Sequence, residues 1–198
     1  MRKIILSMML SADGKTARAD GDLGWFRTDA DFEDEMLSLL DGVDGMFFGR
    51  TSYQLLAEYW PSADAPGAGD APGGFTSRER ALAFTRRMNQ LPKLVVSNTL
   101  RELPWGPAQR LGGDLAAHVA RLRAEPGKDL VVFAGARTAQ SFMRLDLIDE
   151  YRLMLHPLLL GRGQPLFDDL DVELPLARIG ARSFASGVVL LRYARARR

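Results

Sequence analysis

Two junctions, at each of which an apolar strand is followed directly by a helix, most constrain the fold of this chain. The first is G-M-F-F-G-R-T-S-Y at residues 45–53, and the second is D-L-V-V-F-A-G-A-R-T-A-Q-S-F at residues 129–142. In both, a short apolar run ends at glycine, and Arg and then Thr follow in the expected first helical turn. Glycine lets the backbone approach a ligand closely because no Cβ intervenes, and the free N–H groups of a helix start favour an anion. Two such helix ends, each with an arginine, suit one ligand that carries several phosphates, and a dinucleotide is the natural candidate.

The rest of the chain alternates between expected strands and expected helices. Strands are predicted at residues 3–10, 43–48, 93–97, 109–111, 130–133 and 151–156, with a C-terminal hairpin of residues 176–184 and 188–194. Helices are predicted at residues 28–40 with Thr28 as the cap, 50–60, 77–90, 115–124 behind Asp114, and 136–145. Residues 11–25 and the Pro- and Gly-rich residues 61–74 are expected to be loops. The order predicts one α/β domain over residues 1–198, with three α/β/α layers and a mixed, mostly parallel sheet that ends in an antiparallel hairpin.

Composition excludes several classes of function. The formal net charge of +1 gives no reason to expect a nucleic-acid partner. The chain has no cysteine and only two histidines, His118 and His156, which lack metal-ligand spacing, so no metal site is expected. Neither a signal peptide nor a long apolar span is visible, and no membrane partner is expected. These features predict a cytoplasmic protein.

Five motifs in order resemble the dihydrofolate reductase fold, and within it the family of the riboflavin-biosynthesis reductase domain in stand-alone form. They are S-A-D-G-K at 11–15, M-F-F-G-R-T-S-Y at 46–53, V-V-S-N-T-L at 95–100, V-F-A-G-A-R at 132–137 and H-P-L-L-L-G-R-G-Q-P-L-F at 156–167. Together the motifs span nearly the whole chain and stand at predicted strand ends. The zinc motif of the deaminase found in the bifunctional riboflavin enzyme is absent.

The resemblance implies NADPH as the cofactor. The phosphates would lie at the first helix end, on Gly49, Arg50 and Thr51, with Arg50 near the 2′-phosphate. Ser97 and Asn98 would flank the adenosine half, although a turn or capping role fits them nearly as well. The pyrophosphate would lie at the second helix end, formed by Ala134, Gly135, Ala136, Arg137 and Thr138. Ala134 departs from the Gly-Gly usual in this fold, and a helix-packing role for Gly49 with a surface role for Arg50 is the alternative.

The resemblance also implies a hydride transfer, which needs a proton. Asp31, ahead of Glu33, is the expected acid on the first helix, and Asp13 in the loop after the first strand is the second choice. The helix N-terminus favours the ionised form of Asp31, so burial must raise its pKa if it is to work as an acid. In the same family, G-R-G at residues 161–163 would be a structural turn.

The predicted function is therefore an NADPH-dependent reductase of a flat heterocyclic or imine-like small molecule. A true folate or ribosylaminopyrimidine reductase is one alternative. A non-catalytic dinucleotide-binding or regulatory module is another, of a different class. A homodimer is expected through the C-terminal hairpin, whose V-V-L-L run at residues 188–191 lies at or near a sheet edge.

Overall fold

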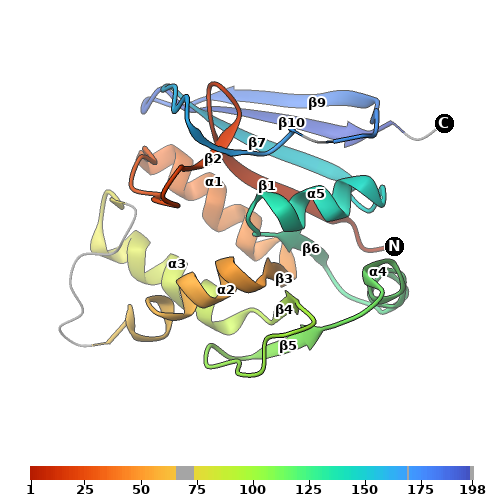
Figure 1. The fold of residues 1–198 in the computed structure, drawn as a ribbon. Coiled ribbons are helices and arrows are strands. Elements are labelled where there is room, and N and C mark those ends of the chain that lie inside the picture. The colour runs from red at the N-terminus through yellow and green to blue at the C-terminus, as the bar shows by residue number, and fades with distance from the viewer. Residues whose placement is uncertain (66–73, 169, 197–198) are drawn as a thin grey trace.

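An eight-stranded sheet forms the middle layer of the molecule (Figure 1). The computed structural model describes residues 1–65, 74–168 and 170–196. The strand order in the sheet is β5-β4-β3-β6-β1-β7-β10-β9; the neighbours from β5 to β7 are parallel, and β10 and β9 are antiparallel. The strands of the chain are β1 (Ile4–Ser11), β2 (Lys15–Arg18), β3 (Val43–Gly49), β4 (Lys93–Val96), β5 (Ala108–Leu111), β6 (Asp129–Val132), β7 (Glu150–His156), β8 (Gly163–Pro165), β9 (Leu176–Ser183) and β10 (Val189–Arg195). The predicted mixed sheet with its antiparallel hairpin is confirmed.

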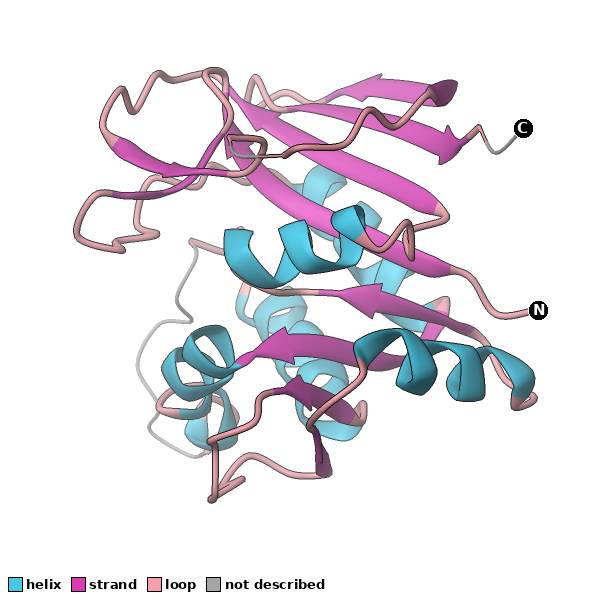
Figure 2. Ribbon diagram, turned by 45° about the vertical axis from the view of Figure 1, so that its right-hand side comes forward, coloured by secondary structure: helices cyan, strands magenta, loops and turns pink. Residues whose placement is uncertain are grey.

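Helices cover both faces of the sheet, as Figure 2 shows. They are α1 (Ala30–Asp41), α2 (Arg50–Ala57), the 3-10 turn η1 (Trp60–Ser62), α3 (Arg78–Gln90), α4 (Leu115–Ala124) and α5 (Ala136–Arg144). The apolar sides of α4 and α5 pack on one face, where Phe142 meets Phe47 edge-on at 5.0 Å. Those of α1, α2 and α3 pack on the other, where Phe48 lies 5.5 Å from Trp105. Each face thus has its own core, and the three-layer prediction is confirmed.

Side-chain caps set where three of the helices begin. Asp29, Ser77 and Asp114 each accept a hydrogen bond from a backbone N–H of the first turn. The prediction of Thr28 as the first cap is wrong by one residue, because Thr28 Oγ1 instead donates to the carbonyl of Gly74 at 2.9 Å. The second helix is also shorter than predicted, since it ends at Ala57 and η1 follows separately.

A small ribbon of β2 and β8 corrects the prediction of a loop over residues 11–25. Lys15 pairs with Pro165 and Arg18 with Gly163 in antiparallel register. Gly163 is required there because a Cβ would meet the Ala17 carbonyl oxygen at 2.5 Å. Residues 161–163 form a turn into β8 that no helix follows, in agreement with the predicted structural role of G-R-G.

The predicted Pro- and Gly-rich loop of residues 61–74 falls for the most part on residues 66–73, which lie outside the described residues. Its near end, at Ser62 and Ala63, continues η1. In the part of the chain that the structure describes, no helix combines the length and the apolar character needed to cross a membrane.

Candidate active site

The two predicted glycine junctions lie side by side at the carboxyl edge of the sheet. Because β3 pairs with β6, the α2 and α5 helices start from neighbouring strands, one on each face. The N–H of Phe133 donates to the carbonyl of Phe47 at 2.9 Å. Just beyond, the N–H of Gly135 donates to Ser52 Oγ at 2.7 Å. Two helix N-termini therefore face one region of surface, as an anion site requires.

The two glycines serve different purposes. Gly49 is buried, and a Cβ added there would collide with Thr138 Oγ1 of α5. The packing alternative thus accounts for Gly49. A Cβ on Gly135 would meet only Ser52 Oγ, at 3.2 Å, and the φ of Gly135 is an ordinary −68°. The packing constraint is milder at Gly135 than at Gly49, because a small shift of Ser52 would relieve it, and glycine at 135 also lets the backbone come close to a ligand.

The start of α5 presents free donors, although not from every predicted residue. Ala134 and Ala136 are both buried, with 7% of each exposed, so neither side chain faces a ligand. Thr138 Oγ1 is engaged in the contact with Gly49. Arg137 is exposed on the first turn, and its side chain makes no hydrogen bond or ion pair with the residues that the structure describes. The guanidinium of Arg137 is therefore available to a phosphate.

Arg50 lies at the start of α2, beside a cavity of about 420 Å³. Its Nε donates to Gln54 Oε1 at 3.2 Å and its guanidinium donates to Thr99 Oγ1 at 3.1 Å. The cavity lies between α2 and the segment that follows β4, and Arg101 also lines it. Thr51 is exposed on the same first turn. The predicted phosphate-binding arginine thus borders an open cavity in a defined orientation.

Ser97 and Asn98 shape a turn at the end of β4. Ser97 Oγ accepts the N–H groups of Thr99 and Leu100 at 3.2 and 3.0 Å. Asn98 Oδ1 accepts the N–H of Gly113 at 2.8 Å. Both polar side chains therefore have internal partners, as the turn alternative predicted. Their contribution to the site is to hold Thr99 and its neighbours against the cavity.

The acid predicted on the first helix lacks the burial that it needs. Asp31 has 72% of its side chain exposed and pairs with Arg182 at 3.2 Å, beside the C-terminal hairpin. The structure therefore does not provide the burial that was set as the condition for a proton donor at Asp31. Glu33 is buried, but its carboxylate accepts the N–H and hydroxyl of Thr76 at 2.7 and 2.6 Å. Glu33 therefore anchors the segment that leads into α3.

Asp13, the second choice, is also unsuited to donate a proton. Its carboxylate accepts the Ser11 hydroxyl at 2.6 Å and the N–H groups of Leu160 and Gly161 at 3.0 and 2.8 Å. The hydrogen bond from Ser11, followed by those from the backbone, lowers the pKa of Asp13 to about 2. The prediction of Asp13 as an acid is corrected, since it fastens the β1–β2 turn to the connection between β7 and β8.

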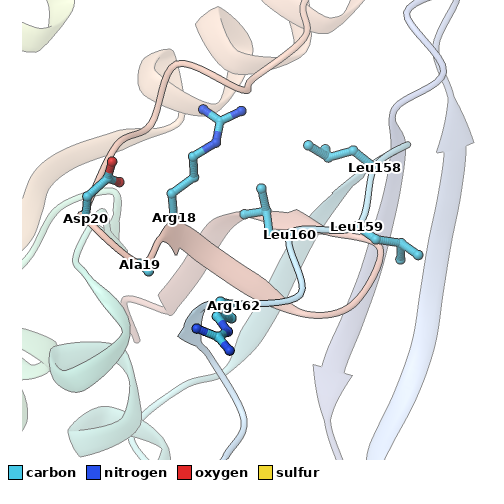
Figure 3. A pocket seen from close by; sticks show the side chains of 7 residues that line it. All are labelled: Arg18, Ala19, Asp20, Leu158, Leu159, Leu160 and Arg162. Carbon is cyan, nitrogen blue, oxygen red and sulfur yellow. The ribbon is translucent and has the colours of Figure 1, made fainter.

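A second cavity of about 420 Å³ lies between the end of β2 and the connection from β7 to β8 (Figure 3). Its lining residues are Arg18, Ala19, Asp20, Leu158, Leu159, Leu160 and Arg162. Figure 3 shows Leu158 pointing toward the wall that carries Arg18, while the guanidinium of Arg162 points away from Arg18. Arg18 pairs with Asp22. The cavity thus combines an apolar wall with polar groups that are already partly engaged.

The helix-covered face opposite α5 presents apolar side chains near the same edge. Met9 of β1 and Phe133 after β6 are only partly buried against the core formed with α1, α2 and α3. Leu56 and Ala57 at the end of α2 are partly buried there as well. Each of these side chains is therefore partly accessible, and a flat ring can stack on apolar groups of this kind.

Sequence analysis missed Ser52, Thr99 and Arg101. Ser52 stands inside the G-R-T-S-Y motif, and its position three residues after Gly49 was the available signal. Thr99 stands inside the V-V-S-N-T-L motif, but the place of Thr99 and Arg101 beside Arg50 depends on the packing of α2 against the segment after β4, which no local pattern shows.

Comparison with known proteins agrees with this geometry. Residues 2–190 match the family model of the RibD C-terminal domain. YyaP, an uncharacterized protein of Bacillus subtilis, is 28% identical over 192 residues, which cover 97% of this chain and 94% of YyaP. A provisionally assigned riboflavin biosynthesis protein from Shewanella sp. PV-4 superposes with a TM-score of 0.75 at 28% identity, over 100% of both chains.

A more distant structure defines the fold. Dihydrofolate reductase from Enterococcus faecalis, solved with NADP(H), superposes with a TM-score of 0.63 at 9% identity, over 98% of this chain and 97% of the reductase. The likeness shows a shared fold. Since the family model extends over nearly the entire chain, the protein belongs to the RibD C-terminal domain family and has the dihydrofolate reductase fold.

Proposed function

We propose that this protein is an NADPH-dependent reductase that transfers hydride to a flat heterocyclic or imine-like small molecule. The observation that carries the proposal is the placement of two helix N-termini side by side, each with an exposed arginine, Arg50 and Arg137, on its first turn. A family of reductase domains and a fold that binds NADP(H) in a distant relative support it.

The residues present fit the cofactor. The first-turn N–H groups of α5 and the guanidinium of Arg137 would hold the pyrophosphate, while Gly135 keeps that approach open. Arg50, held by Gln54 and Thr99, would bind the 2′-phosphate at the mouth of its cavity, with Arg101 on the same wall. Ser52, which accepts the N–H of Gly135, keeps the two helix ends in register.

The bound nicotinamide would supply the hydride. Met9 and Phe133 would orient the flat substrate and exclude water from one side of it. The low pKa of Asp13 leaves that carboxyl ionised at neutral pH, and Asp31 lacks the burial that was expected of an acid on the first helix. We propose that the proton comes from solvent at the open edge of the site.

The alternatives differ in how the observations bear on them. A folate reductase needs a buried carboxylate on the first helix; Asp31 is exposed, and the buried carboxylate of Glu33 is held by the N–H and hydroxyl of Thr76. A ribosylaminopyrimidine reductase remains within the same family. The exposure of Asp31 and the low pKa of Asp13 favour, as the second candidate, a module that binds a dinucleotide without reducing a substrate.

Replacement of Arg50 tests the cofactor. In Arg50→Ala we expect NADPH to bind more weakly by about 1.5–3 kcal/mol, because a charged hydrogen bond to the 2′-phosphate is lost. NADH affinity should hardly change, since NADH lacks that phosphate. Fluorescence titration of both cofactors measures the two effects. Arg121→Ala, on the surface of α4 and paired with Glu125, is the matched control. Equal losses for NADPH and NADH in Arg50→Ala would contradict the assignment.

A further inference from the structure

His156 ends β7 at the carboxyl edge of the sheet, where its strand position pairs with Ser11 of β1. The side chain is fully buried, with 0% exposed. In the sheet, β7 and β6 flank β1, so His156 and the proposed phosphate site lie on opposite sides of β1. The proposed substrate would be held on the side of His156. As one of two histidines in the chain, it is the residue that would first be suspected of proton transfer.

Both ring nitrogens of His156 have partners inside the protein. Nδ1 lies 3.1 Å from the backbone nitrogen of Arg27 and accepts its N–H. A nitrogen that accepts a hydrogen bond carries no proton, so the proton of the neutral ring is on Nε2. Nε2 lies 3.5 Å from Met9 Sδ, to which it donates. The two contacts together define one tautomer.

Aromatic side chains enclose the imidazole. Phe26 stacks on it, with ring centroids 5.5 Å apart and an interplanar angle of 30°. Trp25 and Phe32 meet it edge-on at 5.3 and 6.1 Å. Burial, and secondarily the charge of Arg27, lower the pKa of His156 to about 4. The ring is therefore neutral at physiological pH.

The segment that His156 contacts is otherwise held by the buried Trp25 and by a hydrogen bond from the N–H of Phe26 to the carbonyl of Leu23 at 3.4 Å. Residues 25–27 lie between β2 and α1 without regular structure. Among the described residues, the N–H of Arg27 has no acceptor other than His156. A phenylalanine could fill the same volume, but it would remove the acceptor of this part-buried hydrogen bond. Volume alone therefore does not account for histidine at this position.

We infer that His156 is a positioning residue: its Nδ1 fastens residues 25–27 to the end of β7, and its Nε2–H sets Met9 in the apolar surface on the substrate side. That the substrate lies on this side rests on the proposed function. The hydrogen bond between Arg27 N–H and His156 Nδ1, here called the clasp, is present in the protein without any ligand. Trp25 and Phe26 would thus wall the site in a fixed place before any ligand binds.

Nitrogen-15 NMR of the histidine rings in the wild-type protein tests the tautomer. At pH 7 we expect one ring, that of His156, to be neutral with its proton on Nε2. His118 on α4 serves as the internal comparison; its Nε2 lies 2.8 Å from the carbonyl oxygen of Gly112. The variant His118→Gln shows which ring signals belong to His118. A proton on Nδ1 of His156, or an imidazolium at pH 7, would overturn the inference.

Hydrogen exchange of the Arg27 amide tests the clasp in two variants, which separate the hydrogen-bond acceptor of His156 from its aromatic ring. His156→Asn keeps an acceptor at the position of Nδ1 but loses the aromatic ring, and His156→Phe does the reverse. Exchange at Arg27 should quicken about ten-fold in His156→Phe, the scale of one lost hydrogen bond, and stay near the wild-type rate in His156→Asn.

The outcomes separate the two proposals. Wild-type protection of Arg27 in His156→Phe, or equal loss in both variants, would show that packing rather than the acceptor holds the segment, and would overturn the inference. If His156→Phe does not fold, the wild-type ring spectrum decides. Failure of the wild-type protein to bind NADPH would refute the proposed function and leave the clasp unaffected.

Discussion

At Gly49 the backbone of β3 passes so close to α5 that Thr138 occupies the place of a side chain. The contact brings the starts of α2 and α5 together, and Ser52 completes it from the other direction through its hydrogen bond with Gly135. Gly49 thus permits the two helices to approach, whereas we propose that Gly135 leaves room for the ligand. Both junctions have Gly followed by Arg and Thr, and only the packing distinguishes the two glycines.

Substitution at Gly49 tests the packing role. Gly49→Ala should destabilise the protein by about 1–3 kcal/mol, the usual cost of overpacking, because the new methyl group collides with Thr138 Oγ1. Thr138→Ala removes that oxygen, so the double variant should recover most of the loss. Urea denaturation of the four proteins gives the coupling energy. Additive losses, with no recovery in the double variant, would mean that Thr138 is not the obstacle.

At the scale of elements, the β1–β2 turn is joined to the connection between β7 and β8. Asp13 accepts N–H groups from Leu160 and Gly161, and β2 pairs with β8. Gln140 of α5 donates to the carbonyls of Pro165, Leu166 and Asp168 at 3.4, 3.2 and 3.2 Å. The segment around β8 is therefore held from two sides, and it forms one wall of the cavity beside Arg18.

The low pKa of Asp13 makes its contribution to stability depend on pH. The pKa is lowered from 3.8 to about 2 in the folded protein, so the contribution is fully present above pH 3.8 and is lost as the pH falls through 2. Asp13→Asn should cost about 1–2 kcal/mol near neutral pH, through weakened hydrogen bonds to a charged group. Chemical denaturation from pH 7 to pH 2 should show the difference from wild type shrinking below pH 4. If the difference in unfolding free energy between wild type and Asp13→Asn stays constant down to pH 2, the ionised carboxylate of Asp13 is not what stabilises the turn.

These elements differ in how far local sequence could predict them. Strands such as β1 and helices such as α4 follow from apolar runs and caps within ten or so residues. The K-T-A-R strand β2 has no such pattern, and its partner β8 lies about 150 residues further along the chain, so only the tertiary fold makes it a strand. The pairing of the exposed Asp31 with Arg182 was unpredictable for the same reason, because Arg182 comes from the distant hairpin.

At the scale of the whole molecule, β9 is an edge strand of the sheet, with β10 as its only strand neighbour among the described residues. Seven of its eight residues are exposed, and they include Leu176 and Ile179, with 39% and 50% of their surface accessible. A long edge strand with apolar side chains invites pairing. We propose that two copies of the chain associate through this strand with isologous symmetry.

Light scattering at micromolar concentration tests the dimer. We expect twice the chain mass of 21.9 kDa for the wild-type protein. Ile179→Lys, which places a charge on the proposed contact, should shift the mass toward the monomer. Leu145→Lys, at an exposed leucine after α5, is the matched control and should remain dimeric. A wild-type mass equal to one chain would refute the proposal.

The central claim is that one dinucleotide lies across the starts of α2 and α5, and titration of NADPH into Gly135→Val tests it most directly. A Cβ at Gly135 would meet Ser52 Oγ at 3.2 Å and no other atom within 4 Å among the described residues, so a small shift of the Ser52 side chain should let the variant fold, which circular dichroism verifies. The branched side chain should occupy the approach to the proposed pyrophosphate site. The wild-type protein is expected to bind NADPH, and folded Gly135→Val to bind none that is measurable. Equal NADPH affinity in the two proteins would contradict the account.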